Sequence, residues 1–125
     1  SPLPRTLETA EILMDSLKLP AACRDVDSRV IEVDAGERDG QCYRKYNDQD
    51  FWFPDNPERF GGESREQVQA RVIDLVQSLL NDQQWDLEHQ FIVIVSHGVP
   101  LLLIQEYLGG GSDRLETAGW ELVCL

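Results

Sequence analysis

The 125-residue sequence predicts an α/β fold, a sandwich of helices around a mostly parallel sheet. Two observations support this prediction. The apolar run FIVIV at residues 91–95 indicates a buried strand, and it stands between two segments with helical patterns, 64–79 and 99–108. The segment GWELVCL at residues 119–125 is typical of one more strand. This order of strand, helix and strand favours the sandwich.

The first part of the chain predicts a helix over residues 4–17. Apolar residues recur at helical spacing from Leu7 to Leu17, a proline is tolerated in the first turn, and Pro20 ends the element. Residues 21–34 alternate loosely between apolar and polar side chains. We therefore expect one or two short strands or extended segments there.

Residues 36–62 lack strong periodicity and are rich in Gly, Pro, Asp, Asn and aromatic residues. The segment is longer than loops in compact domains usually are. We expect either short helices within it, with residues 43–48 as one candidate, or a functional lid. A satellite hydrophobic cluster without a functional role is the alternative.

The clearest helix begins after this segment. Ser64 and Gln67 form a capping box, and an apolar stripe extends over residues 68–79. The last helix, residues 99–108, is predicted to end at the glycines 109–111.

Composition restricts the possible partners. A net charge of −12 and a pI near 4.4 argue against nucleic acid, and any phosphate site must be a local basic pocket. No apolar stretch approaches the ~18 residues of a membrane span, and no basic-then-apolar leader is visible. The three cysteines are widely spaced and form no metal motif, which favours a reducing compartment. We expect a cytoplasmic protein without a metal or cofactor; the residues carry no signal for an oligomeric state.

His97 is the first candidate site residue, because it ends the predicted strand directly before a helix. Ligands of open α/β sheets bind beyond the carboxyl ends of the strands, and the amides from Gly98 onward could receive an anion. An imidazole there can serve as nucleophile, acid, base or charged donor. Alternatively, His97 only caps the helix.

Four further residues are candidates. Arg5, near the start of the first helix, could fork onto two phosphate oxygens, although taken alone it is an ordinary surface arginine. Glu32 ends an apolar alternation before a glycine turn, where partial desolvation would raise its pKa and let it donate a proton. Ser1 is a weaker candidate, as is Thr9, because hydroxyl groups near a helix start usually bond to backbone.

Four segments, SPLPRTLETAEIL, VIEVDAGERDGQ, FGGESREQVQARV and IVIVSHGVPLLLI, resemble in order and spacing four landmarks of the histidine phosphatase superfamily, which includes the phosphoglycerate mutases. EVDAG and FGGES are also similar to the fructose-2,6-bisphosphatase branch. The resemblance implies a three-layer sandwich of the phosphoglycerate mutase type. It also implies a metal-independent phosphomonoester hydrolase, or alternatively a mutase, that works through phosphohistidine.

The resemblance further implies roles for the matching residues. Arg5 would clamp the phosphate, Glu32 would protonate the leaving group, and His97 would donate a hydrogen bond to the transferring phosphoryl group. Ser1 and Gly98 would lie at the phosphate site. The partner would be a small phosphorylated substrate, or a phosphate or sulfate ion, with neither nucleic acid nor membrane involved.

The sequence departs from the family in one motif. The family's nucleophilic histidine belongs to an Arg-His-Gly motif at the end of the first strand, before the SPL segment, and no Arg-His-Gly occurs here. We expect residues 1–125 to be one N-terminally incomplete domain of this type, with 36–62 as a lid-like insertion and the first strand missing. Alternatively, the strand comes from a separate chain, or the protein is a pseudo-enzyme that binds phosphate without transferring it.

Overall fold

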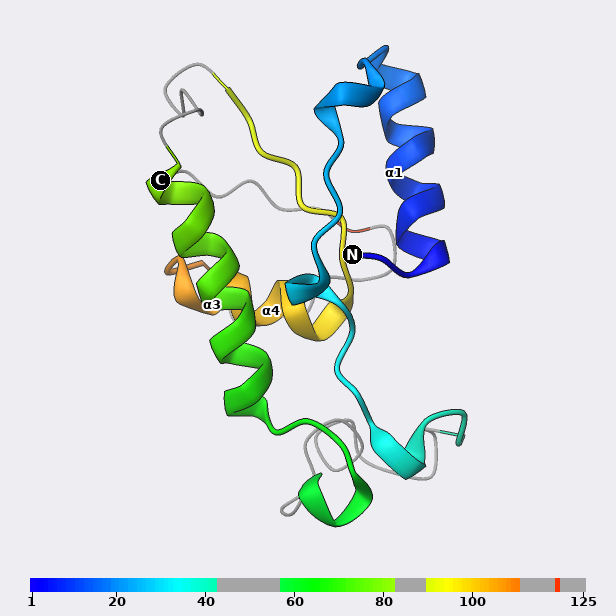
Figure 1. Ribbon diagram of the computed structural model, residues 1–125, viewed down its shortest axis with the longest axis vertical. Helices are drawn as coiled ribbons and strands as arrows, with labels where there is room; N and C mark the ends of the chain where they lie inside the picture. The colour runs from blue at the N-terminus through cyan, green and yellow to red at the C-terminus, as the bar shows by residue number, and fades with distance from the viewer. Residues whose placement is uncertain (43–56, 83–89, 111–118, 120–125) are drawn as a thin grey trace.

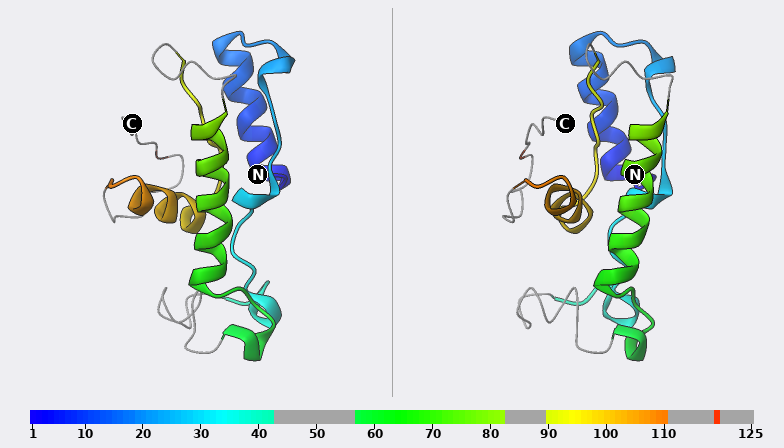
Figure 2. Two further views of the ribbon diagram at one scale, coloured as in Figure 1. Left: turned by 60° about the vertical axis from the view of Figure 1, so that its left-hand side comes forward. Right: turned by 90° about the vertical axis from the view of Figure 1, so that its left-hand side faces the viewer.

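The structure is a computed structural model that describes residues 1–42, 57–82, 90–110 and 119. Its helices are α1 (Pro4–Leu17), α3 (Arg65–Asn81) and α4 (Gly98–Tyr107). The 3-10 turns are η1 (Ala21–Cys23), η2 (Ser28–Val30), η3 (Gly36–Arg38) and η5 (Pro57–Phe60). In Figures 1 and 2, α4 crosses α3 steeply, and α1 stands apart from both. No helix in the described part of the chain is long and apolar enough to span a bilayer.

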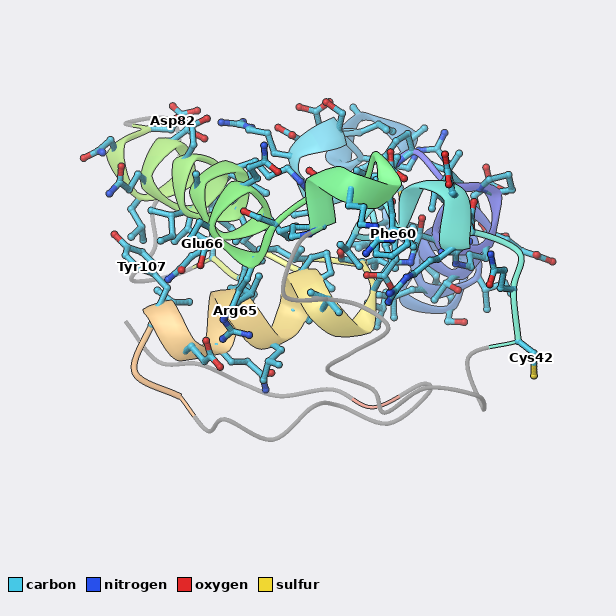
Figure 3. The ribbon with its side chains drawn as sticks, turned by 90° about the horizontal axis from the view of Figure 1, so that it is seen from below. Cys42, Phe60, Arg65, Glu66, Asp82 and Tyr107 are labelled. Carbon is cyan, nitrogen blue, oxygen red and sulfur yellow. The ribbon has the colours of Figure 1, made fainter. Side chains whose placement is uncertain are left out.

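The core lies where α3, α4 and η2 meet. The apolar stripe of α3 is buried there and packs against the first turns of α4, as its helical spacing predicts. The buried residues are Val30, Val33, Val68, Val72, Leu75, Val76, Val99, Leu103 and Ile104. At the edge of this contact, Arg65 of α3, which is labelled in Figure 3, forms an ion pair of 2.5 Å with Glu106 of α4. The core therefore fixes the start of α4 relative to the chain around residue 30.

The three predicted helices are confirmed. α1 has the predicted bounds, and α4 begins and ends one residue earlier than predicted. The capping box of α3 is present, because Ser64 Oγ accepts from the Gln67 amide while Gln67 Oε1 accepts from the Ser64 amide. α1 buries only Thr6, so its apolar stripe is half-covered at best within the described structure.

The predicted three-layer α/β sandwich with a mostly parallel sheet is wrong. The described residues contain helices and 3-10 turns but no strand and no sheet. Residues 91–97 are drawn as an irregular yellow trace (Figure 1), and the supposedly buried run exposes Phe91 by 85% and Val93 by 62%. A strand exists only where a second segment completes its hydrogen-bond ladder, and a local apolar run cannot supply that partner.

Side chains replace that ladder along residues 29–32. Three of the four carbonyl groups accept hydrogen bonds from Arg71, and the fourth, that of Val30, accepts from Ser96 Oγ at 2.7 Å. Backbone carbonyls that leave water need such partners. Part of the segment predicted as short strands is thus fixed by side chains from α3 and from the chain before α4.

Only parts of the predicted lid, residues 36–62, belong to the described structure. They form η3 and η5, which contact each other, whereas the candidate helix 43–48 lies outside the described residues, as does nearly all of the predicted strand 119–125. The two turns meet at glycines. Gly36 has a φ of +58°, and a Cβ there would lie 1.9 Å from the Phe60 carbonyl oxygen. This contact therefore requires glycine at position 36.

Gly36→Ala should lower the free energy of unfolding by more than about 3 kcal/mol, because a left-handed backbone and a steric clash act together. Gly61→Ala is the matched control: its φ is +67°, but no atom lies within 4 Å of the added Cβ. We expect that control to cost only about 1–2 kcal/mol, the usual cost of a left-handed alanine. Urea denaturation followed by circular dichroism measures both, and equal losses would contradict the close approach.

Candidate functional site

His97 lies immediately before α4 in extended backbone, with φ −128° and ψ 168°. Its carbonyl accepts from the Leu101 amide at 3.0 Å, which closes the first helical turn. The imidazole is only 7% exposed and makes no capping hydrogen bond to the helix. The alternative that His97 serves only as a side-chain cap is therefore wrong, and its buried ring contacts another part of the chain.

That contact is Ser1. Ser1 Oγ lies 2.8 Å from His97 Nε2, and the tautomer of the ring decides which group donates. The Ser1 nitrogen also donates to the Val95 carbonyl at 3.2 Å, while Thr6 Oγ1 donates to the Ser1 carbonyl at 3.2 Å. The start of the chain is thus attached to the segment before α4. Ser1, a weaker candidate in the sequence, is the residue in direct contact with His97.

The environment of His97 keeps its ring neutral. Burial is the largest cause, the positive charges of Arg5 and Arg71 act in the same direction, and the pKa of His97 is lowered to about 4. The sequence-based option of a charged donor is thus disfavoured in the unliganded protein. A neutral imidazole surrounded by cationic groups can still donate one N–H to an anion.

Arg5 is in the first turn of α1 with an exposed side chain, and no ion pair joins it to another described residue. Its charge nonetheless acts on the His97 pKa, so the two groups share one electrostatic environment. Thr9 behaves as expected of a helical hydroxyl, since its Oγ1 donates to the Arg5 carbonyl at 2.8 Å. Gly98 is the first residue of α4, beside His97.

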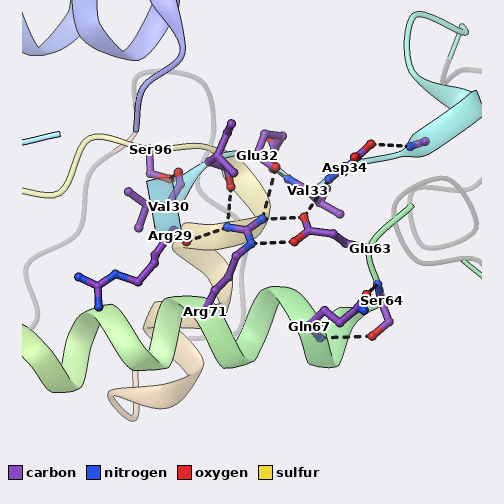
Figure 4. A network of polar contacts seen from close by, with 12 residues as sticks. Arg29, Val30, Glu32, Val33, Asp34, Glu63, Ser64, Gln67, Arg71 and Ser96 are labelled. Carbon is purple, nitrogen blue, oxygen red and sulfur yellow. Dashed lines mark hydrogen bonds and ion pairs between the residues drawn. The ribbon is translucent and has the colours of Figure 1, made fainter. Parts of the chain in front are cut away.

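The segment that carries Glu32 is joined to the segment that carries His97 by a hydrogen bond to its backbone. The Glu32 side chain is partly buried, and Oε1 accepts from the Val33 amide at 3.1 Å. Ser96, the neighbour of His97, donates to the Val30 carbonyl two residues before Glu32. Two predicted site residues that are far apart in sequence therefore belong to adjoining segments, which Figure 4 shows side by side.

Arg71 of α3 connects these segments, although the sequence analysis did not single it out. Its guanidinium donates to the carbonyls of Arg29 (2.7 Å), Ile31 (2.8 Å) and Glu32 (3.3 Å). It also forms a bidentate ion pair with Glu63, in which Nε donates to Oε1 at 2.9 Å and Nη2 donates to Oε2 at 2.8 Å (Figure 4). A signal existed in the sequence, because position 71 lies three residues after Val68 on the inward side of the apolar stripe. Charged residues are rarely buried at such a position unless they have a partner.

Glu63 links Arg71 to the chain beyond Glu32. One of its oxygens accepts from the Asp34 amide at 3.0 Å. Burial alone would raise the pKa of Glu63, but the hydrogen bonds from Arg71 and from the Asp34 amide outweigh it and leave the pKa below its usual range. Glu63 is therefore a carboxylate at neutral pH and the counter-ion of Arg71.

These segments are the ones that carry the family landmarks. A family model described as histidine phosphatase superfamily (branch 1) matches residues 1–125. The chain belongs to the histidine phosphatase superfamily. Comparisons with curated proteins and with solved structures gave no significant match.

Membership of the histidine phosphatase superfamily makes phosphatase or mutase chemistry the general expectation for this site. All four landmark segments contribute to the candidate site, with Ser1 and Arg5 from the first, Glu32 from the second, Glu63 and Arg71 from the third and His97 from the last. In the described part of the chain, no group of three or more His, Cys, Asp or Glu side chains could hold a metal ion.

The pKa of His97 predicts a pH-dependent stability. Since the folded pKa is about 4 and the ordinary value is 6.5, the unfolded state binds the proton more readily between these values. The contribution is complete above pH 6.5 and is lost as the pH falls toward 4; it is at most about 3 kcal/mol. We expect the free energy of unfolding to fall less between pH 6.5 and pH 4 in His97→Gln than in the parent protein. Urea titrations at several pH values measure this difference.

An NMR titration of the His97 ring measures the same property directly. Inorganic phosphate should raise the His97 pKa, because a dianion stabilises the imidazolium. A ring that titrates at the ordinary 6.5 without phosphate would contradict the buried environment described here.

Proposed function

We propose that the protein is a phosphomonoester hydrolase that acts through a phosphohistidine intermediate. The observation that carries the proposal is the buried, neutral His97 at the start of α4, with cationic groups around it and Ser1 Oγ in contact. Preorganised donors of this kind stabilise the charge of a transferring phosphoryl group. The sparse cysteines favour a cytoplasmic location for this activity.

In the proposed reaction, a nucleophilic histidine nitrogen attacks phosphorus and the P–O bond to the leaving alcohol breaks. Glu32, protonated at the start, gives its proton to the departing oxygen and becomes a carboxylate. Water then attacks phosphorus, the P–N bond breaks, and Glu32 accepts the proton of the water. Arg5, His97 and the Gly98 amide hold the phosphoryl oxygens throughout, and Ser1 orients the His97 ring.

The nucleophile is the part of this proposal that residues 1–125 do not supply in the family's context, since they contain no Arg-His-Gly. We propose that it belongs to a segment of the protein before Ser1. The absence of the motif from these residues also favours a second candidate, a phosphate-binding protein without turnover. Mutase activity is the remaining family alternative, in which the phosphoryl group passes to a second hydroxyl instead of water.

The test uses the full-length protein with small phosphomonoesters. We expect phosphate release and a phosphoryl group on protein that is labile to acid. His97→Ala should lower kcat about 10²- to 10³-fold, as loss of a preorganised donor does. Glu32→Gln should lower it about 10²- to 10⁴-fold for alkyl esters, and Arg5→Ala should mainly raise KM.

Glu37→Gln is the matched control, because Glu37 is an exposed carboxylate in the neighbouring turn η3. Its kcat should stay within about threefold of the parent value. Binding of inorganic phosphate that depends on Arg5 without any turnover would favour the second candidate. Unchanged turnover in His97→Ala would refute the assignment of the site.

A further inference from the structure

We infer that Arg71 is a positioning residue for the reaction, which holds the backbone around Glu32 so that its carboxyl group meets the leaving oxygen. This inference rests on the proposed role of Glu32 as proton donor. Arg71 does not touch the substrate in this account. It acts through the chain that carries Glu32.

The hydrogen bonds of Arg71 use its whole guanidinium. An arginine has five N–H donors, and the five here go to three backbone carbonyls and to both oxygens of Glu63. The side chain is only 17% exposed, so each donor needs a protein partner. A lysine has three donors on one nitrogen and cannot span this set of acceptors.

The contacts fix the chain on both sides of Glu32. Arg71 binds the carbonyls of Arg29, Ile31 and Glu32, and Glu63 binds the amide of Asp34. No regular strand is present in this described segment, and its backbone receives these side-chain hydrogen bonds from Arg71 and Glu63 together with the Ser96 bond to Val30. A small shift of the backbone would move the Glu32 carboxyl away from the leaving oxygen, and misplacement by about 1 Å can cost about 10²-fold in rate.

The hydrogen bonds of Arg71 go to groups other than the Glu32 carboxyl. An ion pair with an arginine would hold that group deprotonated and unable to donate. Because all five donors are used elsewhere, the Glu32 carboxyl receives none of them. Glu63 is the counter-ion of Arg71 instead.

The nearby Arg29 offers a matched control. Its side chain also forms ion pairs, with Asp27 at 2.6 Å and Asp74 at 2.7 Å, but these are at the surface. These side-chain contacts do not reach residues 30–34. Arg29→Lys therefore makes the same chemical change nearby, while the hydrogen bonds from Arg71 to the carbonyls of residues 29, 31 and 32 stay in place.

The experiment compares two classes of substrate in the full-length protein. An alkyl phosphate has a poor leaving group that needs a proton, whereas the 2,4-dinitrophenolate of an aryl phosphate leaves without one. Arg71→Lys should lower kcat about 10- to 100-fold for the alkyl ester, with KM nearly unchanged, and leave the aryl ester within about threefold. Glu32→Gln should show the same dependence on the leaving group more strongly, and Arg29→Lys should show none.

The outcomes separate the two proposals. If Arg71→Lys slows both substrates equally while Glu32→Gln is selective, the positioning role is overturned and the proton donor stands. If Glu32→Gln is not selective, the proton donor is overturned and the positioning role with it. If Arg71→Lys does not fold, Glu63→Gln, which weakens the same pair, takes its place with the same two substrates.

Amide hydrogen exchange tests the positioning role without turnover. Arg71→Lys should speed exchange at Val33 and Asp34 at least about tenfold relative to the parent, because opening of this segment is then less costly. Arg29→Lys should leave both amides unchanged. Unchanged exchange in Arg71→Lys would overturn the inference even if the protein had no phosphatase activity.

Discussion

The pair between Arg71 and Glu63 is the interaction on which the site depends. A buried ion pair often contributes little net stability, because removing two charges from water costs nearly as much as their attraction returns. Its effect here is geometric. With both oxygens of Glu63 and three carbonyls as acceptors, the guanidinium has a single arrangement that satisfies every donor, and that arrangement fixes the extended chain.

This arrangement also explains how the segment can lie beside α3 without a sheet. In a sheet, the carbonyls of residues 29–32 would pair with amides of a neighbouring strand. Here Arg71 and Ser96 supply the donors, and the Val30 and Val33 side chains fill the core against α3 and α4. Ser96 stands directly before His97, so the same hydrogen bonds that replace the sheet attach the His97 segment to the Glu32 segment.

The sequence predicted the helices well because their signals are local. Apolar spacing, a proline in the first turn and the box of Ser64 with Gln67 all act within a few residues, and the structure contains each of them. The strand at residues 91–95 was wrong because pairing is a property of two segments, and apolar content alone does not establish a partner. The candidate site residues came from the strand-end position of His97 and from the family motifs, and Arg71 was missed. Its place on the inward side of the apolar stripe was a signal, but its partners are backbone carbonyls about forty positions away, which the sequence does not identify.

Electrostatics reconcile the acidic chain with the proposed site for an anion. A net charge of −12 opposes phosphate at long range, but this repulsion weakens in salt beyond a Debye length of about 8–10 Å. Close to His97 the nearby charges are positive, and their effect is visible in the lowered pKa of the ring. Glu63, the carboxylate in the Arg71 network, is paired with Arg71 and accepts from the Asp34 amide. The electrostatic potential near His97 thus depends on whether the nearby carboxylates are already paired with cationic groups. The total charge of the chain does not determine it.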